Sequence, residues 1–161
     1  PESVSARLDK LAAYAEPFVP LTQLDDENTR ELWREIRDVA PYQDRSLRPL
    51  WRVSVTPSAA AALVGAMRLE AAVDAYYDWQ GGLVWMRMDG APEADILRAL
   101  LKKHGGGHAT LMRADPAARK LTPAFEPQPA AVAALEARIR AKLDPRGIFN
   151  PGKMATQEMA A

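Results

Sequence analysis

The chain contains no cysteine, which excludes disulfide bonds, cysteine-bound iron–sulfur clusters and thiol catalysis within these residues. Long apolar runs are also missing, since none approaches the roughly 20 residues of a membrane-spanning helix. The first residues, PESVSARLDK, lack the basic and then apolar stretches of a secretory signal. We therefore expect a cytoplasmic protein. Because the chain begins without Met, we also expect it to be a piece of a longer protein.

An excess of charge of either sign is absent as well. Lys+Arg and Asp+Glu each number 21, whereas nucleic-acid-binding domains usually carry a basic stripe and a high pI. DNA, RNA and acidic lipid are therefore not expected as main partners. What is present is ordinary for a soluble globular protein, with 48% hydrophobic and 26% charged residues. The length of 161 residues fits one domain.

Helical periodicity is found towards both ends of the chain. It predicts helices over Val4 to Ala15 and Thr29 to Val39, with the side chains of LDDEN able to cap the second. A proline-rich link from Pro116 to Pro129 is expected before a last helix. The apolar residues expected to be buried by the second and last helices are Leu32, Trp33, Ile36 and Val39, and Val132, Leu135, Ile139 and Leu143.

The middle of the chain predicts a sheet. WRVSV alternates apolar and polar residues as a half-buried strand does, and Thr56 and Pro57 suit the start of a helix. AVDAYYDWQGGLVWMRM reads as two strands joined by a tight turn at Gln80 to Gly82. A helix from Pro92 to Lys103 and the strand HATLMR complete the order β-α-β-β-α-β. The sequence therefore predicts an α+β fold, with a ferredoxin-like antiparallel sheet covered on one face by two helices and flanked by others.

Several familiar kinds of site are not indicated. His104 and His108 are four residues apart, but the glycines between them break the helical geometry that such a pair needs to hold a metal, so no metal site is expected. The glycines of HGGGHAT follow a helix and precede a strand, the reverse of a phosphate-binding loop. No G-x-S-x-G signature marks a nucleophile, and the catalytic residues stay unknown.

Weak candidates for binding a substrate remain on the predicted strands. Arg52, Arg87 and Arg113 are either surface charges or clamps for a carboxylate or phosphate. Tyr76 should share one face of its strand with Asp74 and Asp78, while Val73, Ala75, Tyr77 and Trp79 share the other. That polar face is either solvated or turned towards a ligand, and His108 has the same two possibilities. We retain Arg52, His108, Arg113 and Tyr76 as candidates.

The C-terminal segment LDPRGIFNPGKM is more specific. It resembles the D-P-x-G-I-[FL]-N-P-G-[KR] signature of FAD-linked oxidases of the vanillyl-alcohol oxidase superfamily. LWREIRD, PLWRVSVTP, DWQGGLVW and GGGHATLMRA are similar, in the same order, to the E-type, FAD-binding subunits of bacterial glycolate oxidases. The likeness extends over nearly the whole chain.

The resemblance implies that residues 1–161 form a single C-terminal cap domain of a larger flavoprotein, with most of the FAD held by an N-terminal domain outside this chain. It implies oxidation of glycolate or a similar 2-hydroxy acid in a complex with a homologous D-type flavin subunit and an iron–sulfur F-type subunit. Residues 144–161 would be a cofactor-facing turn and tail, with Asn150, Gly152 and Lys153 beside the flavin and Phe149 as an apolar anchor. Peripheral attachment to the inner membrane through the complex is an alternative to a purely cytoplasmic location.

One departure from the superfamily and two alternatives remain. The paired histidines that hold a metal in related 2-hydroxy-acid dehydrogenases have no counterpart here, so an E-type subunit that holds flavin for electron transfer or assembly is also possible. The chain could instead be a free-standing ferredoxin-like ligand-binding module, or an assembly module without catalysis. Turn chemistry alone would make Pro145, Pro151 and Gly152 a helix stop.

Overall fold

The structure is a computed structural model, and it describes residues 2–150. Contacts divide the chain into two compact units, residues 1–43 and residues 44–161, and each is described by itself. The prediction of a single cap domain remains a prediction.

The first unit consists of α1 (Glu2–Ala15), α2 (Asp26–Arg37) and the short 3-10 helix η1 (Ala40–Tyr42). Both predicted helices are confirmed, and α2 is capped by Asp25, whose side chain accepts a hydrogen bond from the Asn28 amide at 2.8 Å. The expected burial is wrong, however, because α2 contains no buried residue and Trp33 is 61% exposed. Helical spacing specifies which side chains share a face, but it does not supply a partner for that face.

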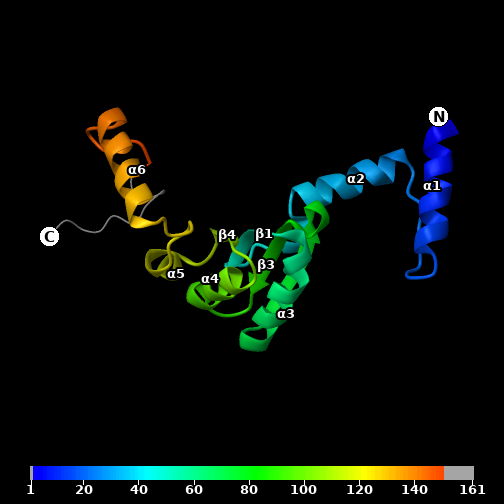
Figure 1. The fold of residues 1–161 in the computed structure, drawn as a ribbon, viewed down its shortest axis with the longest axis horizontal. Helices are drawn as coiled ribbons and strands as arrows, with labels where there is room; N and C mark the ends of the chain where they lie inside the picture. Colours follow the sequence, from blue (N-terminus) through cyan, green and yellow to red (C-terminus); the bar gives the residue numbers. More distant parts are fainter. Residues whose placement is uncertain (1, 151–161) are drawn as a thin grey trace. The chain divides into compact units, whose positions relative to one another are not determined.

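The second unit contains the predicted sheet. Its strands are β1 (Leu50–Val55), β2 (Val73–Asp78), β3 (Leu83–Met88) and β4 (Gly107–Arg113), and its helices are α3 (Ala60–Glu70), α4 (Ala94–Lys103), α5 (Pro116–Leu121) and α6 (Ala130–Leu143). The strand order is β2-β3-β1-β4, and every neighbouring pair is antiparallel. These elements confirm the α+β, ferredoxin-like prediction (Figure 1).

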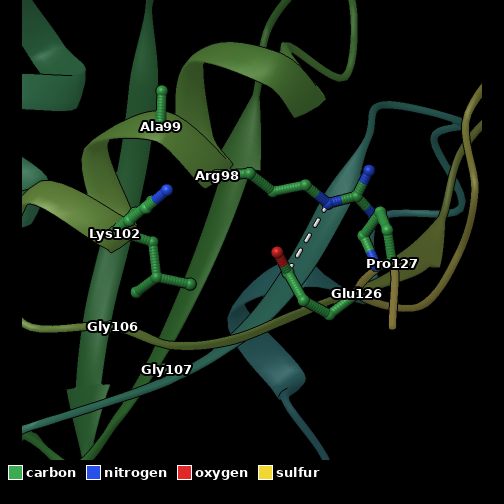
Figure 2. Close-up of a pocket in the computed structure, with 8 residues that line it drawn as sticks. Arg98, Ala99, Lys102, Gly106, Gly107, Glu126 and Pro127 are labelled. Carbon is green, nitrogen blue, oxygen red and sulfur yellow. Dashed lines mark ion pairs between the residues drawn. The ribbon is translucent and has the colours of Figure 1, made fainter. Parts of the chain in front are cut away.

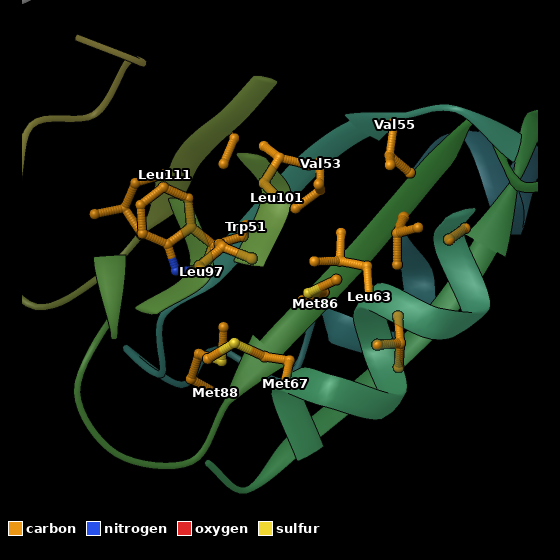
Figure 3. Packing of buried hydrophobic residues seen from close by; sticks show 14 of the residues in the cluster. Trp51, Val53, Val55, Leu63, Met67, Met86, Met88, Leu97, Leu101 and Leu111 are labelled. Atoms are coloured by element: carbon orange, nitrogen blue, oxygen red, sulfur yellow. The ribbon is translucent and has the colours of Figure 1, made fainter. Parts of the chain in front are cut away.

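The core lies between the sheet and the helices α3 and α4 (Figure 3). Trp51, Val53 and Val55 alternate along β1 and point into it, as the sequence pattern predicts. The Trp51 indole nitrogen donates a buried hydrogen bond to the Pro92 carbonyl at 2.8 Å, so the polar atom of this core side chain is satisfied. The other core members include Leu63, Met67, Met86, Met88, Leu97, Leu101 and Leu111. The opposite face of the sheet, which we call the outer face, is turned away from α3 and α4.

The turns show how the chain reverses around this sheet. The hairpin between β2 and β3 is confirmed, and its turn is the 3-10 helix η3 (Trp79–Gly81), in which Trp79, Gln80 and Gly81 all have positive φ. Thr56 does not cap a helix with its side chain as expected, because a 3-10 turn, η2 (Pro57–Ala59), precedes α3. Gly107, at the start of β4, has φ +141° and lies so close to the Ser54 carbonyl that a β-carbon would collide with it.

The segment predicted as a link also differs from expectation. It contains α5, which begins after Asp115, whose carboxylate accepts hydrogen bonds from the amides of Ala117 and Ala118 at 2.9 and 3.0 Å. Pro116 does not interrupt this helix, because the first helical position needs no amide proton. Residues 122–126 then run beside β4, where the Leu111 amide donates to the Ala124 carbonyl at 2.8 Å.

The last helix is present, but its predicted burial is wrong. The side chains of α6 expected in a core are exposed, and Leu143 is 77% exposed. After α6 the chain turns at Asp144, whose carboxylate oxygens accept hydrogen bonds from the amides of Ile148 at 3.0 Å and Phe149 at 2.8 Å. Within residues 2–150, no helix has the length and apolar character needed to cross a membrane.

Candidate functional site

The outer face carries three rows of side chains that run across the strands, because cross-strand partners in an antiparallel sheet point to the same side. The middle row joins Tyr76 of β2, Trp85 of β3, Arg52 of β1 and Thr110 of β4. A second row joins Asp78, Leu83, Ser54 and His108, and a third joins Asp74, Arg87, Leu50 and Arg113. All four substrate candidates named from the sequence therefore lie on one face.

Arg52 is at the centre of this face and is only half-buried. Its guanidinium carbon lies 5.2 Å from the centroid of the Trp79 ring, a cation–π distance. Trp79 was expected on the opposite face, and its position in the turn rather than in β2 explains the difference. No described acidic residue forms an ion pair with Arg52. Its charge is thus stabilised by an aromatic ring and is available to an anion.

Tyr76 is separated from Arg52 by Trp85, which is almost fully buried. Burial, with a smaller contribution from the nearby charge of Asp78, raises the pKa of the Tyr76 phenol to about 12. Tyr76 therefore stays protonated at neutral pH and can donate a hydrogen bond. His108, in the neighbouring row, is exposed.

Arg113 is on the same face, but its guanidinium is bound to groups of its own chain. Its Nε donates to the Arg48 carbonyl at 3.2 Å, and its Nη2 lies 3.6 Å from Asp44. Asp44 also pairs with Arg87 at 3.0 Å, and Arg87 pairs with Asp74 at 3.0 Å. The charges in this row thus compensate one another within the chain, so Arg113 is a poorer candidate for a substrate than Arg52.

Hydrogen bonding from Ser46 is the main reason that the pKa of Asp44 falls to about 2, and the charges of Arg113 and Arg87 contribute less. The Ser46 amide donates to the Asp44 carboxylate at 3.0 Å. Asp44 is consequently a fixed negative charge at neutral pH, and it anchors the polypeptide that precedes β1 to the end of the sheet.

The C-terminal candidates are described only in part, because Gly152 and Lys153 lie outside the described residues. Asn150 is exposed and has φ 46°, and its side chain forms no hydrogen bond with any described residue. The Asp144 carboxylate shapes the turn that presents it. Phe149 is 71% exposed, so the expectation that it anchors the turn by burial is wrong for this structure. No hydrogen bond or ion pair among residues 2–150 joins Asn150 to Arg52 or His108.

A hollow lies between α4 and residues 126–127, lined by Arg98, Ala99, Leu101, Lys102, Gly106, Gly107, Glu126 and Pro127 (Figure 2). The Arg98 Nε is 3.5 Å from the Glu126 carboxylate, and its Nη2 donates to the carbonyls of Pro123 and Phe125 at 2.8 and 2.9 Å. Arg98 also lies over the Trp51 ring, 5.6 Å from its centroid. These charges hold the chain together, and the hollow is a weaker candidate site than the outer face.

Sequence reasoning overlooked Asp44, Trp85, Arg98 and Glu126. Arg98 could have been found, because Ala94, Leu97, Arg98 and Leu101 share one helical face and an arginine on a buried face needs partners. Asp44 and Glu126 had no comparable signal, since both lie in irregular segments whose course the pattern does not specify. In the described part of the chain, no three His, Asp or Glu side chains are grouped so that they could hold a metal ion.

Comparison with known proteins points to one class, the subunits of glycolate oxidase. The matching protein is glycolate oxidase subunit GlcE of Escherichia coli (strain K12), which is 28% identical over 129 residues. The match covers 80% of this chain, whereas the chain spans about a third of that relative, 32% of its length. No family model and no solved structure matches the chain. The likeness supports a relationship to the GlcE family.

Proposed function

We propose that this chain is the cap domain of an FAD-dependent 2-hydroxy-acid oxidase or dehydrogenase subunit of the glycolate oxidase kind. Similarity to GlcE over most of the chain supports the class. The cap closes over the flavin, contributes to cofactor and substrate binding, and takes part in subunit assembly. The chain alone is expected to be inactive, because neither of its glycine-rich segments is a strand-to-helix phosphate loop.

The observation that carries the substrate part of the proposal is Arg52. A guanidinium can bind a carboxylate through two parallel hydrogen bonds, and Arg52 has no acidic partner among the described residues. Trp79 and Trp85 border it, and Tyr76 in the same row is a protonated donor at neutral pH. A small 2-hydroxy acid presents one carboxylate and one hydroxyl group. Arg52 suits the first, and Tyr76, Thr110 or His108 suits the second.

The described residues fit FAD only at one place. Asn150 is exposed in a left-handed turn, and its side-chain amide, which has no hydrogen-bond partner among residues 2–150, can both donate and accept hydrogen bonds. Gly152 and Lys153 would follow it, and a lysine favours negative charge on a nearby group. When bound, FAD supplies the hydride acceptor for oxidation of the hydroxyl-bearing carbon. The residues of this chain hold and orient cofactor and substrate.

The proposed partners are the protein's own N-terminal FAD-binding domain, a homologous D-type flavin subunit and an iron–sulfur F-type subunit. The proposed location is the cytoplasm, with peripheral attachment to the inner membrane through the complex as an alternative. These assignments extend the relationship to GlcE.

A second candidate function is assembly without catalysis. It is favoured by α6, whose apolar side chains Val132, Leu135, Ile139 and Leu143 are all exposed. Exposed apolar residues at helical spacing are suited to a partner surface. A free-standing ligand-binding module is the remaining alternative, and it would bind a small metabolite without any effect of flavin.

The test compares Arg52→Met, Arg52→Lys and Arg119→Met in the full-length protein with its partner subunits. Arg119 is an exposed arginine whose side chain has only one described hydrogen bond, a long one of 3.4 Å to the Met112 carbonyl, and it serves as the control. If Arg52 binds the carboxylate, Arg52→Met raises KM for glycolate at least tenfold with FAD content unchanged, Arg52→Lys raises it less, and Arg119→Met leaves it unchanged. Such a factor corresponds to about 1.4 kcal/mol.

An unchanged KM in Arg52→Met would remove the substrate role. Cofactor binding is tested by purifying the full-length protein and measuring bound FAD. A colourless protein that still assembles with its partner subunits would favour the assembly function, and a colourless protein that binds a metabolite alone would favour the module.

A further inference from the structure

The two edges of the sheet differ in how they are protected. At the β4 edge, the Leu111 amide is bonded to Ala124, and the Ala109 amide lies 3.4 Å from the Glu126 carboxylate. The pairing of β4 with β1 also shifts register between Leu50 and Trp51. A covering segment and a bulge are two of the ways in which proteins prevent an edge strand from pairing with another chain.

The β2 edge has neither device. Within the described residues β2 pairs only with β3, in a register without a shift. Its sequence, VDAYYD, contains no proline, glycine or lysine. The negative charge of Asp74 is already paired with Arg87 at 3.0 Å. An edge of this kind is able to accept another strand.

The ladder fixes which backbone groups face outwards. The Asp89 amide donates to the Ala72 carbonyl at 3.1 Å, and hydrogen-bonded pairs alternate along an antiparallel ladder. The N–H and C=O groups of Val73, Ala75 and Tyr77 therefore point away from β3. Only the Val73 carbonyl has a described partner there, the Arg68 Nε at a long 3.4 Å. Tyr77 is also exposed.

We propose that β2 pairs with β2 of a second copy of this chain, antiparallel, about a twofold axis at Ala75. The outward N–H of Ala75 in each copy then donates to the Ala75 carbonyl of the other copy, and Val73 exchanges the same two N–H···O=C bonds with Tyr77 of the other copy. The two sheets become one continuous sheet. Alanine at the axis is small enough for Val73 and Tyr77 to pack on either side of it.

Side-chain charge selects this register. With the axis at Ala75, Asp74 faces Tyr76 of the other copy and Asp78 faces Ala72. An axis at Tyr76 would instead place Asp74 opposite Asp78 twice, and an axis at Asp74 would oppose that carboxylate to itself. Like charges directly opposite each other destabilise a strand pair. The other possible axes use fewer residues of the strand.

The absence of cysteine from the chain permits a direct test of the register. Ala75→Cys places two thiols in a cross-strand pair with Cα atoms about 5.5 Å apart, within disulfide range. In Tyr77→Cys alone, the two cysteines are four residues apart along the paired strands, so their Cα atoms are separated by about 13 Å. We expect the 161-residue chain to have twice its monomer mass in light scattering. Mild oxidation should then cross-link Ala75→Cys, should not cross-link Tyr77→Cys or Val73→Cys alone, and should cross-link a mixture of the last two.

A second test uses two variants of Ala72, which directly precedes β2, so that the residues of the strand itself are unchanged. Ala72 is exposed and faces Asp78 of the other copy, so Ala72→Lys should lower the dimer dissociation constant and Ala72→Glu should raise it, with matching circular dichroism spectra. A monomer at all concentrations would overturn the proposal. A dimer in which Tyr77→Cys cross-links as fast as Ala75→Cys, or in which the Ala72 variants are equivalent, would place the interface elsewhere and overturn it equally.

Discussion

Replacing Arg98 by Ala tests the contact that holds residues 122–126 beside the sheet. The Arg98 side chain is only 12% exposed, and its guanidinium serves the Pro123 and Phe125 carbonyls and the Glu126 carboxylate. Truncation to alanine removes all three interactions at once. It also uncovers part of the Trp51 ring.

The expected loss of unfolding free energy is about 3 kcal/mol. The bond to the part-buried Pro123 carbonyl contributes about 1.5–3 kcal/mol, as hydrogen bonds from charged donors do. The bond to Phe125 is exposed and contributes less, because water replaces the donor. The ion pair with Glu126 is long, at 3.5 Å, and adds about 0.5 kcal/mol.

The assay is chemical denaturation together with amide hydrogen exchange. Arg119→Ala is the matched control in the neighbouring helix and should change stability by less than about 0.5 kcal/mol. Arg98→Lys should recover about half of the loss, since an ammonium cannot reproduce the fork of a guanidinium. Exchange of the Ala109 and Leu111 amides should accelerate, while amides joining β1 to β3 keep their protection. A cost equal to that of Arg119→Ala, or uniform acceleration in all strands, would refute the reasoning.

Three further predictions concern the charge of Asp44 and the C-terminal turn. The folded-state pKa of Asp44, about 2, lies below the ordinary value, so its stabilisation is present above about pH 4 and is lost as the pH falls towards 2. Asp44→Asn should flatten the fall of the urea midpoint over that interval, and parallel curves for the two proteins would contradict this. Phe149→Ala should cost no more than about 0.5 kcal/mol because the ring is exposed. Asp144→Ala should accelerate hydrogen exchange of the Ile148 and Phe149 amides, which donate to its carboxylate. Equal exchange rates in Asp144→Ala and in the unaltered protein would show that the carboxylate does not hold the turn.

The sheet could be predicted because its signals are local and mutually consistent. Alternation over Trp51 to Val55 identifies both the strand and its buried face, and the glycines after Gln80 mark the turn. In a half-buried antiparallel sheet, the period of two decides which side chains share a face. The common location of Arg52 and Tyr76 on the outer face therefore follows from the sequence once the strand order is known.

The helices at the two ends were predicted correctly as helices and incorrectly as buried elements. Periodicity depends on the chain itself, whereas burial depends on a second surface that the pattern of Trp33 or Leu143 does not contain. The ion pairs of Asp44 and the contacts of Arg98 were missed for a similar reason. Each joins residues far apart in sequence, and nothing in the local pattern of residues 122–126 shows that this segment returns to β4.

The outer face owes its chemical asymmetry to the distribution of acidic residues around it. Arg87 and Arg113 lie at the end of the sheet that Asp44 reaches, and both form ion pairs with Asp44 that hold the segment preceding β1 against the sheet. Arg52 lies one row away, where the neighbouring positions are Trp85 and Thr110 and no described carboxylate compensates it. The Arg52 charge lies against the Trp79 ring but is compensated by no described carboxylate, so its desolvation would be offset by an opposite charge brought from outside the chain. This contrast within one face, rather than the presence of arginine on a strand, is what distinguishes Arg52 as the group to which a small carboxylate would bind.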